Sequence, residues 1–198
     1  MRRIGLGGGI GSGKSTLEAI LRQRGFPVLD ADAVVRDLLQ PGTPLLEALV
    51  DAFGTAILTP SGTYDRQFVA SVIFSDPAAR RRINSIVHPS VGRVLREFLD
   101  SHSTDVPAAF VAIPLLRSEH RTDLALDEVW ILEVDPEEAV RRLITGRSMS
   151  ESDARARVRA QMSNEERRRL ADFVIDNSGS PEDLRSRVDE RLAVWGIV

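Results

Sequence analysis

The sequence predicts an α/β fold in which a parallel five-stranded sheet is flanked by helices. Two observations carry this prediction: five short segments are apolar along their length, and helical segments separate them. Uninterrupted apolar runs are typical of parallel strands that helices cover on both faces. A chain of 198 residues is long enough to bury a sizeable core, so we expect a single domain over residues 1–198.

The predicted strands and helices alternate with clear boundaries. The strands are residues 3–6, 27–30, 108–113, 128–134 and 173–176. Three helices are expected to begin where a capping residue precedes a proline at the first helical position. These pairs are residues 76–77, 135–136 and 180–181.

Two long helical stretches interrupt this alternation. Residues 33–103 carry almost wholly helical signals around a Gly/Pro/Thr-rich turn at 54–63, which predicts an inserted helical subdomain between the second and third strands. Residues 136–170 are helical and dense in arginine, which predicts lid-like helices.

Composition excludes several classes of protein. The formal net charge of −3 argues against a dedicated nucleic-acid binder, which carries a basic excess. The chain has no cysteine, so it has no disulfide framework and no thiolate metal site. No stretch reaches the ~18 apolar residues that a membrane span needs, so we expect a cytoplasmic protein without a membrane partner. No feature of the sequence indicates an oligomeric state.

The most specific motif lies near the N-terminus. Residues 8–15 read G-x-x-x-x-G-K-S between an apolar strand and a helix, which is the context that a phosphate-binding P-loop requires. In this motif backbone N–H groups surround the phosphates, Lys14 reaches the terminal phosphates, and the Ser15 hydroxyl binds Mg²⁺. We therefore expect a sheet of the P-loop NTPase type that binds ATP and Mg²⁺. The expected nucleotide-binding residues are Gly9, Ile10, Gly11, Ser12, Gly13, Lys14, Ser15, Thr16 and, at the end of the fifth strand, Asn177.

Lys14 is also the only lysine among the 26 basic residues of the chain. Arginine replaces lysine easily at solvated positions but less easily where a compact charge on a flexible stem is needed. The single retained lysine therefore points to the same motif.

Asp30 and Asp32 follow the second predicted strand. Ligands of open α/β sheets bind beyond the carboxyl ends of the strands, so either carboxylate could accept a proton from an attacking hydroxyl. The alternative is that one of them only caps the next helix. If the strand persists, both side chains project the same way. Arg36 could bind an anionic acceptor or pair with Asp32 one turn earlier.

Other candidates are more ambiguous. His88 precedes Pro89, which marks a predicted helix junction, so this histidine could be structural. Arg66 could lie on the surface at a helix start. Among the lid arginines, Arg147 lies at a break between helices and could supply charge to the transition state, although arginine-rich helices are usually solvated. Asn177 could contact adenine or lie in a plain turn.

Taken in order, these residues resemble the dephospho-coenzyme A kinase family. The segments that carry the resemblance are residues 5–15, 30–32 with Arg36, 88–89, 114–116, 157–161 and 171–179. The sequence departs from the family pattern at Gly7, where threonine is usual, and at Glu119, which is shifted by one position.

The resemblance implies an activity and roles for individual residues. Members transfer the γ-phosphate of ATP to the ribose 3′-hydroxyl of dephospho-coenzyme A, the last step of coenzyme A synthesis. It makes Asp32 the catalytic base and Lys14 and Arg147 the groups that stabilise the phosphate. It assigns the acceptor to the helical insertion, with Arg36, Arg66 and His88 as substrate-binding residues, and we expect Asp30, just before the insertion, to bind substrate as well.

Three other functions fit parts of the sequence. Another small-molecule kinase, such as one for nucleoside monophosphates, would share the P-loop. A regulatory GTPase would need an Asn-Lys-x-Asp motif, which a chain with one lysine in the P-loop does not have. A non-catalytic nucleotide-binding module would not need Asp30 and Asp32.

Overall fold

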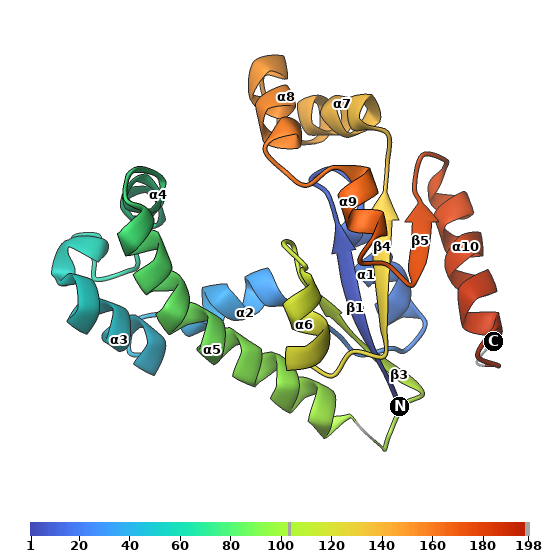
Figure 1. Cartoon of the computed structure of the whole chain (residues 1–198), viewed down its shortest axis with the longest axis horizontal. Coiled ribbons are helices and arrows are strands. Elements are labelled where there is room, and N and C mark those ends of the chain that lie inside the picture. The colour runs from blue at the N-terminus through green and yellow to red at the C-terminus, as the bar shows by residue number, and fades with distance from the viewer. Residues whose placement is uncertain (103, 197–198) are drawn as a thin grey trace. The chain divides into compact units, whose positions relative to one another are not determined.

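A computed structural model describes residues 1–102 and 104–196, and its sheet has the strand order β2-β3-β1-β4-β5 (Figure 1). The strands are β1 (Arg2–Gly8), β2 (Val28–Asp30), β3 (Ala108–Ala112), β4 (Glu128–Glu133) and β5 (Phe173–Asp176). β1 pairs in parallel with β3 and β4, and β4 pairs in parallel with β5. The predicted parallel sheet is confirmed.

The chain divides into two compact units. The sheet unit comprises residues 1–29 and 99–198, and the helical unit comprises residues 30–98. The predicted insertion covered residues 33–103, and its last residue, Ser103, lies outside the described residues. That the whole chain acts as one kinase domain stays a prediction.

The core of the sheet unit lies where the central strands meet two helices. Ile4, Leu6 and Leu132 from the strands pack with Leu17 of α1 (Lys14–Gln23) and Val188 of α10 (Pro181–Ala193). All five side chains are almost fully buried. Because β1 lies in the middle of the sheet, the loop that follows it starts from a rigid base.

Three further helices follow β4 and form the arginine-rich stretch. They are α7 (Pro136–Arg147), α8 (Glu151–Arg159) and α9 (Asn164–Arg168), and Figure 1 shows α7 and α8 beyond the carboxyl end of β4. The predicted cap of α7 is present, because the Asp135 carboxylate accepts from the backbone N–H of Glu137 at 2.8 Å. A short helix, α6 (Ser118–Asp123), connects β3 to β4.

The helical unit has a small apolar core of its own. Its elements are α2 (Ala31–Leu38), α3 (Pro44–Phe53), the 3₁₀ turn η1 (Thr55–Ile57), α4 (Arg66–Ser75) and most of α5 (Pro77–Ser101). Leu39, Leu45, Leu49, Ile57, Val69 and Ile83 are buried together in this core.

The predicted helix junction at Pro89 is wrong, because α5 continues through this proline. Proline removes one backbone donor and leaves the carbonyl four residues earlier without its helical partner. Pro89 and Ser85 are both exposed, so water can solvate the carbonyl of Ser85. Ile83 and Leu95, on either side of the proline, are buried, and their packing keeps the helix intact.

In the part of the chain that the structure describes, no helix is long and apolar enough to cross a membrane.

Candidate active site

The predicted P-loop connects β1 to the N-terminus of α1. Gly13 precedes the helix with φ +91° and Gly11 has φ +76°, two left-handed conformations that favour glycine. Among the described residues no side chain caps the start of α1, and its first turn holds no acidic residue. The helix N-terminus therefore presents free N–H groups and a partial positive charge to an anion.

Two amide side chains from distant segments make hydrogen bonds to the backbone of the loop. Asn177, which is 7% exposed, donates from Nδ2 to the carbonyl of Ser12 at 2.7 Å. Gln161 accepts at Oε1 from the backbone N–H of Ile10 at 2.7 Å. The side chain of Asn177 thus supports the loop, whereas its predicted contact with adenine stays a prediction.

Lys14 is half-buried and has a carboxylate partner within α1. Its Nζ lies 3.4 Å from an oxygen of Glu18, whose other oxygen lies 3.2 Å from Arg22. Glu18 is only 5% exposed. Because Glu18 is shared between Lys14 and Arg22, it keeps Lys14 near the loop without neutralising the charge of Lys14 alone.

Ser15 and Thr16 occupy the exposed first turn of α1, as the P-loop interpretation requires. The described residues contain no cluster of three or more His, Asp or Glu side chains that could bind a metal ion by themselves. Mg²⁺ retains several waters and usually binds through one or two protein groups together with substrate phosphates. A single hydroxyl at Ser15 fits this kind of site.

The second strand does not persist to Asp32, so Asp30 and Asp32 do not project the same way from one strand, and the alternative that one of them caps the next helix is confirmed for Asp30. β2 ends at Asp30 and α2 begins at Ala31, because Asp30 caps the helix by accepting from the N–H of Asp32 at 3.0 Å. The carboxylate of Asp30 is therefore occupied as a cap. Asp32 is exposed in the first turn of α2, and Arg36 is exposed one turn later.

The other predicted acceptor residues also lie in the helical unit. Arg66 opens α4, directly after its capping residue Asp65, and is exposed. His88 is exposed on α5, immediately before Pro89. These residues belong to the helical unit and the P-loop belongs to the sheet unit, and that they act together stays a proposal.

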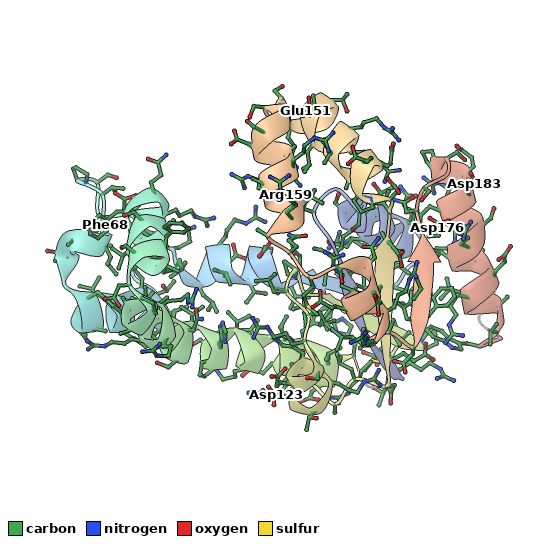
Figure 2. The ribbon with its side chains drawn as sticks, turned by 45° about the horizontal axis from the view of Figure 1, so that its top comes forward. Phe68, Asp123, Glu151, Arg159, Asp176 and Asp183 are labelled. Atoms are coloured by element: carbon green, nitrogen blue, oxygen red, sulfur yellow. The ribbon has the colours of Figure 1, made fainter. Side chains whose placement is uncertain are left out.

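The lid arginines differ in their surroundings. Arg147 ends α7 and is exposed, and Ser148 follows it with φ 50°, which confirms the predicted break between helices. Arg155 is bound to Glu137 and Glu151 at 2.7 and 2.8 Å, and these carboxylates raise the pKa of Arg155. Arg159 is exposed at the end of α8 opposite Glu151 (Figure 2).

Two arginines that the sequence pattern did not single out lie close to the P-loop. Arg142 donates to the carbonyl of Asn177 at 2.8 Å, and its guanidinium lies within 4 Å of where a side chain on Gly13 would begin. Arg167 lies against Gly9. Only tertiary contacts distinguish these two from the many solvated arginines of the same stretch.

A cavity of about 120 Å³ lies beside the loop within the sheet unit. Gly9, Ile10 and Ser12 line it from the P-loop, and Gln161 and Arg167 line it from the segment around α9. The cavity therefore lies between the loop and residues from the last part of the arginine-rich stretch.

Sequence comparison identifies the family to which this site belongs. The sequence profile of the dephospho-CoA kinase family matches residues 2–183. The chain belongs to the dephospho-CoA kinase family. The site described above is therefore that of a P-loop kinase of this family.

Individual proteins are similar to this chain over nearly its whole length. The dephospho-CoA kinase of Symbiobacterium thermophilum is 43% identical over 98% of this chain and 80% of its own. The crystal structure of TT1252 from Thermus thermophilus is 38% identical, has a TM-score of 0.81 and covers 97% of this chain and 96% of its own. The dephospho-CoA kinase from Campylobacter jejuni shares the fold with a TM-score of 0.71 at 24% identity, covering 98% of this chain and 96% of its own.

Gly7, which replaces the threonine usual in the kinase family, lies under two apolar side chains. A Cβ atom at this position would lie 2.5 Å from Cδ1 of Ile131 and 3.4 Å from Cβ of Leu116. Here Ile131 fills the space that a threonine side chain would need.

Proposed function

We propose that this kinase transfers the γ-phosphate of ATP to the ribose 3′-hydroxyl of dephospho-coenzyme A, giving coenzyme A and ADP. The observation that carries the proposal is the preformed phosphate loop with its single lysine, in a chain of the dephospho-CoA kinase family. The substrates are two small molecules, and we expect the reaction to take place in the cytoplasm.

The nucleotide side of the reaction is assigned to the P-loop. The backbone N–H groups of residues 9–16 bind the phosphates, while the Lys14 ammonium neutralises charge that develops on the transferred group. Mg²⁺ supplies further neutralisation of the phosphates when it is bound, and the Ser15 hydroxyl would hold it. Asn177 keeps the loop in its binding shape through Ser12.

The acceptor side is assigned to the helical unit. The acceptor oxygen forms a bond to the γ-phosphorus as the bond to the β–γ bridging oxygen breaks, and Asp32 takes the hydroxyl proton. Arg36, Arg66 and His88 bind the acceptor, which carries phosphate groups that arginine recognises well. Asp30 orients the Asp32 backbone through its helix cap.

Arg147 is assigned to the lid. An exposed arginine at a break between helices can reach a bound phosphate once the lid moves, and its contact would matter most in the transition state. Arg147→Ala is therefore expected to lower kcat more than it raises the KM for ATP.

The test is a coupled assay of ATP consumption with separate acceptors. Dephospho-coenzyme A should be phosphorylated far faster than any nucleoside monophosphate, and phosphorus NMR of the product should show a 3′-phosphomonoester. A preference for a nucleoside monophosphate would replace the proposed acceptor. ADP formation without any acceptor turnover would indicate a nucleotide-binding module instead.

A further inference from the structure

Gln161 presents one oxygen to two donors at the start of the P-loop. Its Oε1 lies 2.7 Å from the backbone nitrogen of Ile10 and 3.4 Å from NH2 of Arg167. Backbone N–H groups of a P-loop are donors for phosphate oxygens. The amide oxygen of Gln161 therefore occupies a position where a loop N–H and a guanidinium converge on one acceptor.

Arg167 is held at this position by packing and, besides Gln161, by a second neutral partner. Its guanidinium lies over Gly9, where an added Cβ would be 2.8 Å from NH2 and 3.0 Å from Cζ. NH1 donates to Oδ1 of Asn164 at 2.8 Å. A side chain at residue 9 would displace the guanidinium, so glycine here permits the close approach of arginine to the loop.

The charge of Arg167 has no carboxylate at ion-pair distance within residues 1–102 and 104–196. Its two arginine neighbours differ, because Arg168 pairs with Glu133 and Arg169 pairs with Glu165. Burial lowers the pKa of Arg167, while the more distant charges of Glu133 and Glu166 raise it less. A half-buried guanidinium next to a phosphate loop is well suited to bind an anion.

We propose that Arg167 and the N–H of Ile10 together bind the terminal phosphate of ATP, and that Gln161 occupies this donor pair until the nucleotide enters. When ATP binds, a γ-phosphate oxygen takes the place of Oε1, and the amide of Gln161 turns away. Arg167 is then a catalytic residue that stabilises charge on the transferred phosphate, and Gln161 is a positioning residue. This inference rests on the proposed phosphate-transfer function and adds to it a second arginine besides Arg147.

The assignment predicts different effects for nucleotides with and without a third phosphate. Arg167→Met removes the charge and retains an apolar stem. Its kcat should fall about 10²- to 10³-fold, as for loss of one preorganised group that stabilises transition-state charge. Calorimetry should show roughly tenfold weaker binding of the non-hydrolysable β,γ-imido analogue of ATP, the loss expected for one charge-assisted contact, whereas ADP affinity should stay unchanged.

Two further variants separate this role from a structural one. Arg169→Met changes an exposed arginine that directly follows α9 and pairs with Glu165 of that helix, so it should alter neither binding nor turnover. Gln161→Ala removes the competing oxygen, so the analogue should bind at least as tightly as to the unmodified enzyme. If Gln161 only supports the loop, Gln161→Ala should instead bind both ADP and the analogue more weakly.

Two negative outcomes would have different meanings. Equal losses of ADP and analogue binding in Arg167→Met would overturn the assignment and leave Arg167 as a support of the loop. Failure of the unmodified enzyme to phosphorylate dephospho-coenzyme A would remove the proposed acceptor. The contrast between analogue and ADP binding would still test the γ-phosphate contact in that case.

Discussion

Several residues around the P-loop of the sheet unit are held far more firmly than the candidate residues of the helical unit. Around the P-loop, Ser12 and Glu18 are buried and Asn177 and Gln161 are hydrogen-bonded to the loop backbone. In the helical unit, Asp32, Arg36, Arg66 and His88 are all exposed.

This difference in burial and hydrogen bonding agrees with the ligands that we propose for the two groups, namely the nucleotide phosphates and the acceptor. A phosphate loop must direct several backbone donors at one anion, which requires a shape fixed before the ligand arrives. Long side chains on exposed helix surfaces lose entropy only when a substrate orders them. We therefore expect loss of a group that supports the loop to affect both stability and nucleotide binding, and changes in the helical unit to affect only the acceptor side of the reaction.

Asp32→Asn tests the acceptor side and should have the largest effect. The substitution preserves shape and removes the proton acceptor, so single-turnover phosphate transfer should slow by about 10² to 10⁴-fold. Calorimetric binding of dephospho-coenzyme A should persist. Asp30→Asn should be milder, because an asparagine oxygen can still cap α2. If the two variants exchange these behaviours, Asp30 is the base.

Lys14→Arg tests the nucleotide side. Arginine retains the charge but has a larger, planar head group in a loop shaped around a compact ammonium. We expect kcat to fall at least about a hundredfold, the scale for loss of one group that stabilises transition-state charge. The free energy of unfolding, measured with denaturant, should change little. Near-normal turnover would remove the phosphate role of Lys14.

Asn177→Ala tests whether the loop is preorganised. Loss of the donor leaves the carbonyl of Ser12 without this partner in a buried place, which costs about 1 to 3 kcal/mol of stability. Affinity for ATP and for ADP should fall together, because the loop shape serves both. Asn84→Ala, at an exposed position of α5, is the matched control. Unchanged nucleotide affinity in Asn177→Ala would contradict the proposed support.

Arg66→Ala should have the smallest effect, and that effect should be confined to binding of the acceptor. Loss of one charge-assisted contact to the acceptor should raise the KM for dephospho-coenzyme A by roughly tenfold, with the KM for ATP and the melting temperature unchanged. Arg93→Ala, which removes another exposed arginine of the helical unit, should leave both KM values as they were. A change in ATP affinity from Arg66→Ala would break the division between the two units.

Several predictions succeeded because the local sequence was sufficient to make them. The apolar runs predicted the strands, and the glycine spacing with Lys14 predicted the loop. The capping residue Asp135 predicted the start of α7. Pro89 failed because burial of Ile83 and Leu95 on either side of it outweighs one lost helical hydrogen bond.

The sequence by itself determined the sheet, the phosphate loop and the family, because these follow from short-range periodicity and from one ordered motif. Only the tertiary structure decided which of the many arginines and amides touch the loop. Arg142, Gln161, Arg167 and Asn177 all come at least 129 residues after Gly13, the last glycine of the P-loop, and lie near the loop only through folding. A pattern of local spacing carries no information about such contacts, since a solvated arginine and a phosphate-binding one have the same neighbours in sequence.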